Sequence, residues 1–190
     1  RGKSKPTTSQ ENTLQAWDLQ LSACGSRLIR GRLNVLSLLR PYMQAAYADL
    51  ADGAKEASAV YRSSLEGEVD DASLPARDLE TLGQEEIQEL LLTAIEANRS
   101  RELDRGISLF GPHRDELVLT LCAAPAKGYA SHGESWSFAL DLKLGSFDLL
   151  RDDGVQPVLI LDDVFAELDQ VRRERLAGMV AEAEQVLITA

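Results

Sequence analysis

The chain has 190 residues and a formal net charge of −11, with 44% hydrophobic and 27% charged residues. This composition excludes a disordered protein, and the longest aliphatic run, residues 158–161, is far shorter than the ~20 apolar residues of a membrane span. Two cysteines, Cys24 and Cys122, are too few for a disulfide scaffold, so we expect a cytoplasmic protein with no membrane partner. Because the chain lacks an initial Met and stops within an apolar run, we expect a fragment cut at both ends.

The charge is distributed unevenly along the chain. Residues 1–62 hold nine Lys and Arg against five Asp and Glu, a net charge of +4, which leaves −15 for residues 63–190. A basic segment in an acidic chain favours contact between that segment and a polyanion. The alternative is that these basic side chains only solvate a long helix.

The first 105 residues are predicted to be mainly helical. Apolar residues recur every three or four positions from Leu14, which is the spacing of one helix face. Pro41 should end or kink this first helix, and Gly106 should stop the last one. The expected elements are a loop (1–10), helices (12–40, 41–52 and 84–105), a short strand near 59–63 and an acidic loop (67–75).

Residues 106–190 follow a different pattern. Short aliphatic runs alternate here with amphipathic segments, which predicts a parallel sheet covered by helices and a domain boundary near residue 105. The expected elements are strands (117–121, 158–161 and 186–188), helices (131–150 and 168–183) and a turn (125–128).

The doubled acid after the strand at 158–161 is the strongest chemical signal. The carboxyl end of such a strand opens into the crevice where α/β folds bind ligands, so Asp162 and Asp163 would reach a bound ligand. In nucleotide hydrolases this pattern is the Walker B element: the first acid holds Mg²⁺, usually through water, and the next orients the attacking water. The alternative is an Asp that only caps the following helix.

Two further polar segments, one before and one after the doubled acid, are informative because of their order along the chain. Ser131 and Gly133 open a predicted helix and offer a hydroxyl and unhindered N–H groups to a phosphate, although Ser131 and Glu134 also form an ordinary capping-box pattern. Residues 167–169, alone, are an acidic helix start. A Ser-x-Gly-Glu helix start, about thirty residues to a doubled acid, then a Leu-Asp turn resembles the arrangement of ABC-type ATPases.

Together these motifs resemble the RecF family of SMC/Rad50-like ABC ATPases. Residues 131–134 resemble its signature motif, residues 161–163 its Walker B element and residues 167–169 its D-loop. Residues 17–25 and 60–65 resemble the start of the family's helical arm and its YRSSL-like stretch. The most specific likeness is the family's GPHRD segment, found here as Gly111, Pro112, His113, Arg114 and Asp115.

The resemblance implies an α/β fold: the C-terminal lobe of an ABC-type ATPase head, at 106–190, joined to an α-helical lever arm, at 1–105. It implies a cytoplasmic protein of DNA replication, DNA repair and the SOS response that forms a homodimer around ATP. Such proteins bind double-stranded or gapped DNA and help to load recombinase with RecO and RecR. His113 and Arg114 receive no chemical role from it, and a turn held by their side chains is the alternative.

The resemblance also assigns roles to single residues. Asp162 would hold Mg²⁺ through water, Asp163 would be the catalytic base, and Asp169 would communicate across the dimer. The residues expected to contact ATP held by the opposite subunit are Ser131, His132, Gly133 and Glu134. The charge of the basic segment, and not a motif, gives the candidates for DNA binding on the arm: Arg27, Arg30 and Arg32.

The signature segment departs from the family pattern. RecF signatures usually read Ser-Gln-Gly-Gln-Gln-Arg, whereas this chain carries His132, Glu134 and Ser135, and Trp136 replaces the arginine. Either ATP-driven dimerisation is altered, or Trp136 packs beneath the signature helix. We expect the family's histidine or threonine switch to lie beyond Ala190.

The phosphate loop of such ATPases is absent from the sequence. No G-x-x-x-x-G-K-[ST] motif occurs, and residues 2–4 (Gly-Lys-Ser) lead into an arm-like helix instead of a strand of the sheet. We therefore expect a fragment that lacks the N-terminal lobe and is inactive by itself. The alternatives are another SMC-like or transporter-type ABC subunit, and a non-catalytic dimerisation or DNA-binding module.

Overall fold

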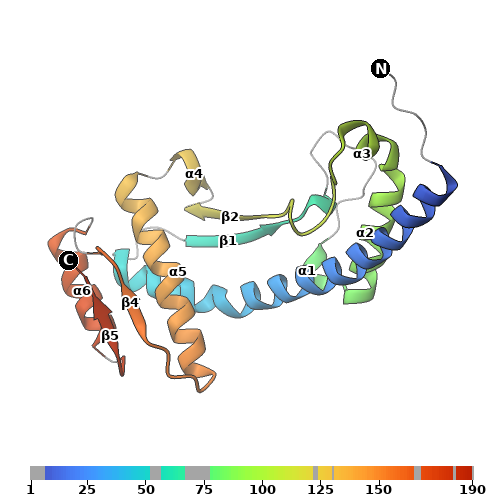
Figure 1. Ribbon diagram of the computed structural model, residues 1–190. Helices are drawn as coiled ribbons and strands as arrows, with labels where there is room; N and C mark the ends of the chain where they lie inside the picture. Colours follow the sequence, from blue (N-terminus) through green and yellow to red (C-terminus); the bar gives the residue numbers. More distant parts are fainter. Residues whose placement is uncertain are drawn as a thin grey trace. The chain divides into compact units, whose positions relative to one another are not determined.

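The computed structural model describes residues 7–51, 57–66, 78–121, 124–129, 131–164, 168–181 and 183–189. By packing, the chain divides into two compact units. The first comprises Arg1–Val35 and Tyr61–Leu117, and the second comprises Leu36–Val60 and Val118–Ala190. This division passes through a helix and two strands, α1, β1 and β2, whose bounds are given below (Figure 1). The lever-arm and lobe boundary near residue 105 stays a prediction.

Helix α1, Thr8–Ala51, is 44 residues long and begins earlier than predicted. Thr7 starts it, because the Thr7 hydroxyl accepts the N–H of Gln10 at 3.4 Å and the Gln10 side chain accepts the N–H of Thr7 at 2.8 Å. This reciprocal pair is a capping box, and its Thr-x-x-Gln pattern is legible in the sequence.

The prediction that Pro41 ends the first helix is wrong, because α1 continues through it to Ala51. Proline inside a helix removes one hydrogen bond and crowds a carbonyl, at a cost of about 3 kcal/mol. Burial of the flanking apolar side chains, with about 1.5–3 kcal/mol for each Leu or Met among them, offsets this cost. Gly145 of the next long helix also packs closely here, since a Cβ at Gly145 would lie 3.0 Å from the backbone nitrogen of Met43. The buried flanking residues are Leu36, Met43, Ala46, Tyr47 and Leu50.

The helix predicted over 84–105 is two helices, α2 (Gln84–Ala97) and α3 (Arg99–Arg105). Asn98 separates them with a non-helical backbone and bonds its side-chain amide to the carbonyl of Ala94 at 3.0 Å. The stop at Gly106 is confirmed. The 3₁₀ turns η1 (Ser64–Glu66) and η2 (Leu79–Thr81) stand in the same unit. The predicted acidic loop at 67–75 lies outside the described residues.

In the part of the chain that the structure describes, the strands form two sheets instead of the single parallel sheet that was predicted. Strands β4 (Leu159–Leu161) and β5 (Val186–Ile188) pair in parallel, as expected. The strand predicted at 117–121 is β2 (Glu116–Leu121), but it lies between β1 (Ala57–Arg62) and β3 (Ala124–Pro125). The two residues between β2 and β3 allow only an antiparallel hairpin, because a parallel pair needs a crossover of a dozen residues or more.

Three helices complete the second unit: α4 (Ala126–Tyr129), α5 (His132–Asp152) and α6 (Gln170–Val180). Non-helical angles at Lys127 and Gly128 make α4 the predicted turn. One apolar core holds the unit together, and it takes side chains from α1, α5, β4 and α6, including Leu50, Leu144, Leu161 and Leu176. No helix in the described part of the chain is long and apolar enough to cross a membrane.

Candidate functional site

The doubled acid lies at the carboxyl end of β4, as predicted. Asp162 and Asp163 directly follow Leu161, and both are exposed. Thr189, which follows the neighbouring parallel strand β5, contacts both of them: its hydroxyl donates to Asp162 Oδ1 at 2.5 Å and accepts the N–H of Asp163 at 2.9 Å. Sequence reasoning missed Thr189, although a polar residue after a strand parallel to β4 is the signal that would have found it.

The residues at this strand end fit a magnesium ion that is held partly by a nucleotide. Asp162 presents an exposed carboxylate, and hard oxygen ligands are those that Mg²⁺ prefers. Among the described residues, no group of three or more His, Cys, Asp and Glu side chains gathers into a metal cage. One or two carboxylates completed by phosphates and water is the usual arrangement for Mg²⁺ in nucleotide sites.

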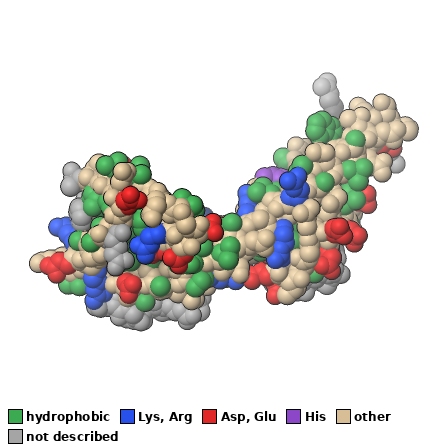
Figure 2. All heavy atoms as spheres, turned by 90° about the horizontal axis from the view of Figure 1, so that it is seen from below, with side chains coloured by type: hydrophobic (Ala, Val, Ile, Leu, Met, Phe, Trp, Pro, Cys, Tyr) green, Lys and Arg blue, Asp and Glu red, His purple; other side chains and the backbone are tan. Residues whose placement is uncertain are grey.

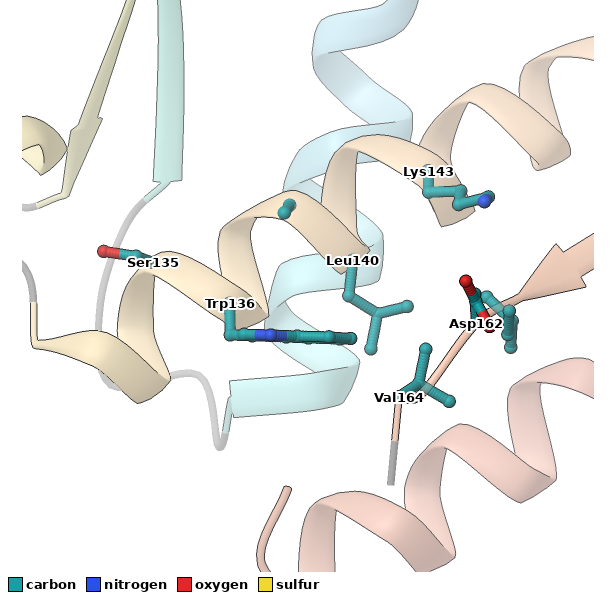
Figure 3. Close-up of a pocket in the computed structure, with 8 residues that line it drawn as sticks. Ser135, Trp136, Leu140, Lys143, Asp162 and Val164 are labelled. Atoms are coloured by element: carbon teal, nitrogen blue, oxygen red, sulfur yellow. The ribbon is translucent and has the colours of Figure 1, made fainter. Parts of the chain in front are cut away.

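A cavity of about 330 Å³ opens beside Asp162, between α5 and β4 (Figure 3). Trp136, Leu140 and Lys143 line it from α5, while Asp162 and Val164 line it from the end of β4. Trp136 is partly buried and packs against the core of the unit. Of the two expectations for this departure from the family signature, the structure therefore agrees with Trp136 packing beneath the helix.

The signature segment begins α5, and Ser131 is the N-cap. The hydroxyl of Ser131 accepts the N–H of Glu134 at 3.3 Å, and the Glu134 carboxylate accepts the N–H of Ser131 at 2.8 Å. The capping box is therefore real, and it fixes the start of the helix. Ser131 itself is exposed, while the side chain of His132 lies outside the described residues.

Arg172 links the signature segment to the predicted D-loop. Asp169 caps α6, because its carboxylate accepts the N–H of Arg172 at 2.9 Å, and it lies 3.8 Å from the Arg172 guanidinium. The same guanidinium lies beside Gly133, 3.8 Å from where a Cβ on that glycine would stand. The structure thus brings Gly133 and Asp169 to one cation, whereas Glu167 lies outside the described residues. Arg172 was not predicted.

In the first unit, the GPHRD segment is a turn held by its neighbours. Asp115 accepts from the Tyr61 hydroxyl at 2.5 Å and from the backbone N–H of Ser64 at 2.7 Å. Burial and then the bond to Asp115 raise the pKa of Tyr61, so this phenol stays a donor. Gly111 bonds through its N–H to the Ser64 hydroxyl at 3.0 Å, and its φ of 130° suits a glycine. Arg114 also holds the turn, since its Nε donates to the carbonyl of Ser108 at 2.9 Å, whereas His113 has no hydrogen bond within the described residues.

The comparisons with known proteins agree with this arrangement. A RecF protein, "DNA replication and repair protein RecF", of Arthrobacter sp. (strain FB24) is 50% identical over 202 residues, covering 98% of this chain and 50% of that protein. The protein of the same name from Paenarthrobacter aurescens is 49% identical, with 98% and 51% covered. The chain is a RecF homologue. It spans about half the length of the curated relatives it matches. No family model matches the chain.

Solved RecF structures share the fold. One, described as "the recombination mediator protein RecF-ATP in RecFOR pathway", superposes with a TM-score of 0.75 at 24% identity, covering 94% of this chain and 46% of that one. The corresponding "RecF-ATPrS" structure gives a TM-score of 0.74 at 26% identity, covering 100% and 46%. The predicted fold class, an α/β ABC-type ATPase fold of the RecF kind, is therefore confirmed.

The structure separates the three arginines of the basic segment that were predicted to bind DNA. Arg30 donates to the carbonyls of Glu80 and Leu82, both at 2.9 Å, and Arg32 donates to the carbonyl of Pro112 at 2.7 Å. These two guanidinium groups therefore hold loops of the first unit. Arg27 is exposed, and within the described ranges no hydrogen bond engages it. Figure 2 shows Lys and Arg side chains interspersed with Asp and Glu on the face in view, without one continuous basic patch.

Proposed function

We propose that the full-length protein binds and hydrolyses ATP between two copies of itself, assembles on double-stranded or gapped DNA, and helps to load recombinase with RecO and RecR. The observation that carries the proposal is the pair Asp162 and Asp163 at the carboxyl end of β4, in a chain that is a RecF homologue along nearly its whole length. This strand end is where α/β folds place groups that act on a ligand.

In this proposal the two acids have separate tasks. Asp162 holds Mg²⁺, which neutralises charge on the β- and γ-phosphates when it is bound. Asp163 accepts a hydrogen bond from the attacking water and receives its proton. The two acids also differ in backbone conformation, because Asp163 has a φ of 50° whereas the φ of Asp162 is not positive.

The start of α5 serves the ATP bound to the opposite subunit. Ser131 offers its hydroxyl, and the N–H groups near Gly133 point along the helix axis with the positive end of the helix dipole, which suits a γ-phosphate. In this proposal Asp169, whose partner Arg172 lies beside Gly133, passes a change at that phosphate to α6. Because the sequence holds no phosphate loop, we expect these 190 residues to be inactive as a monomer.

Replacing Arg27 by Glu in the full-length protein is expected to weaken binding of double-stranded DNA. If Arg27 contacts a phosphate, losing that contact reduces the slope of log affinity against log salt by about 1. Arg30 and Arg32 are unsuitable for this test, since reversing them also breaks the loop contacts described above. Fluorescence anisotropy with a labelled duplex at several salt concentrations measures the slope.

A matched control for Arg27 is Lys127→Glu, which makes the same charge change at an exposed turn of the second unit. We expect Lys127→Glu to leave the salt slope unchanged. Equal slopes for wild type and Arg27→Glu would contradict the placement of DNA on this face of α1.

A further inference from the structure

The residue that follows β5 is built into the end of the neighbouring strand. β5 runs parallel to β4 with Leu161 opposite Ile188, and the N–H of Thr189 donates to the carbonyl of Leu161 at 3.0 Å. This backbone bond joins the residue after β5 to the last residue of β4. It brings the Thr189 side chain to the two acids although 25 residues or more separate them in sequence.

The Thr189 hydroxyl both donates and accepts a hydrogen bond. It donates its proton to Asp162 Oδ1 and accepts the N–H of Asp163. A hydroxyl can do this because it has one donor and two acceptor positions. One side chain therefore orients the carboxylate of the first acid and the backbone of the second.

The backbone of Asp163 needs such support. Its φ of 50° is positive, which in the described part of the chain occurs at no other residue except glycines. This conformation costs a non-glycine residue about 1–2 kcal/mol, so it persists only where surrounding contacts hold it. The bond from the Asp163 N–H to Thr189 is a contact of this kind.

We propose that Thr189 is the positioning residue of the nucleotide site: its hydroxyl holds Asp163 in the left-handed conformation that directs its carboxylate away from the strand, and turns one oxygen of Asp162 inward so that the other is presented to Mg²⁺. This inference rests on the proposed function of the two acids. It adds a residue that contacts neither nucleotide nor water in the proposal, and acts through Asp162 and Asp163.

The test compares Thr189→Val, which keeps the branched shape and the backbone bond but removes the hydroxyl, with Thr189→Ser, which keeps the hydroxyl. Thr93→Val, at an exposed position of α2, is the matched control. All are made in the full-length protein. Loss of a group that orients a metal ligand costs about 10- to 100-fold, so we expect Thr189→Val to lower single-turnover ATP hydrolysis by that factor. Thr189→Ser and Thr93→Val should remain close to wild type.

Two readouts do not depend on activity. Hydrogen exchange in the protein without nucleotide or metal should be faster at the Asp163 amide in Thr189→Val than in wild type or Thr189→Ser. With a fluorescent ATP analogue, the Mg²⁺ concentration at half-maximal binding should rise for Thr189→Val only. If the Thr189→Val protein melts at a lower temperature than the Thr189→Ser protein, Thr189→Ala takes the place of Thr189→Val in all three measurements, because alanine adds no methyl group to the strand end.

The inference would be overturned if the variant without the hydroxyl matched wild type in all three measurements: the rate of ATP hydrolysis, the hydrogen exchange of the Asp163 amide, and the Mg²⁺ concentration at half-maximal binding. The proposed function is tested separately by Asp163→Asn. If Asp163→Asn abolishes turnover and Thr189→Val has no effect, only the positioning role fails. If Asp163→Asn hydrolyses ATP normally, the assignment of the acids fails and the role of Thr189 fails with it.

Discussion

Replacing Asp163 by Asn in the full-length protein is expected to reduce ATP hydrolysis by about 10²- to 10⁴-fold, the usual contribution of a general base, and to leave ATP binding intact. The amide cannot take the proton of the attacking water. Asn tolerates the left-handed conformation at least as well as Asp, and its N–H can still bond to Thr189, so the strand end should keep its shape. Phosphate release in single-turnover experiments measures the loss, and equilibrium binding of a fluorescent ATP analogue measures what is kept.

The control for this variant is Asp153→Asn, an identical change at an exposed position after α5. It should hydrolyse ATP at the wild-type rate. Sustained hydrolysis by Asp163→Asn would show that Asp163 is not the base and that the acidic pair has another role.

The second large effect concerns Asp141, a fully buried acid on α5 between the buried side chains of Phe138 and Leu144. Neither carboxylate oxygen has a hydrogen-bond partner of ordinary geometry. Burial raises the pKa of Asp141 from 3.8 to about 7, and the nearby backbone N–H of Tyr47 opposes this shift only in part. A buried acid without a partner is costly when it ionises.

The sign of the pH dependence follows from this raised pKa. Below about pH 4 the folded and unfolded chains both hold the proton, and between about 4 and 7 only the folded chain does. The contribution of Asp141 to stability is therefore fully present at low pH and is lost as the pH rises through 7. Asp141→Ala should raise the melting temperature at pH 8 by a few degrees, corresponding to about 2 kcal/mol, with a much smaller change at pH 5.

Differential scanning calorimetry of the full-length protein at the two pH values makes this comparison. Asp49→Ala, at an exposed position of α1, is the control and should show no difference between pH 5 and pH 8. An equal or lower melting temperature for Asp141→Ala at pH 8 would mean that the carboxylate finds a partner on ionising.

The elements that sequence predicted well are those whose signal is local. The apolar periodicity of α5, the stop at Gly106 and the aliphatic run before Asp162 each lie within a few residues, and each is confirmed. Pro41 shows where a local rule fails. The free-energy cost of a proline inside a helix is a local property, but the burial of apolar side chains on both sides of Pro41 outweighs that cost. The prediction of a single parallel sheet was wrong for a related reason. Strand pairing depends on segments that are distant in the sequence, and β2 pairs with β1 and β3 instead of joining β4 and β5.

The candidate site follows the same division. Asp162 and Asp163 could be predicted because a strand end followed by acids is one continuous pattern. Thr189 could not, because its contact with them depends on the parallel register of β4 and β5. The anchoring roles of Arg30 and Arg32 were also hidden, since their partners lie 50 and 80 residues further along the chain. Charge alone therefore predicted one role, DNA binding, for three arginines. In the structure, two of them hold loops and only Arg27 is left as a candidate for DNA binding.

The central claim is that these 190 residues carry the acids and the signature segment of an ATP site, but no phosphate loop. Calorimetric titration of the 190-residue chain with ATP and Mg²⁺ tests it most directly, at a concentration where sedimentation shows a monomer and circular dichroism shows folded helix. We predict no saturable binding in the micromolar range, while the full-length protein binds under the same conditions. Saturable micromolar binding of one ATP per monomer of this chain would contradict the claim.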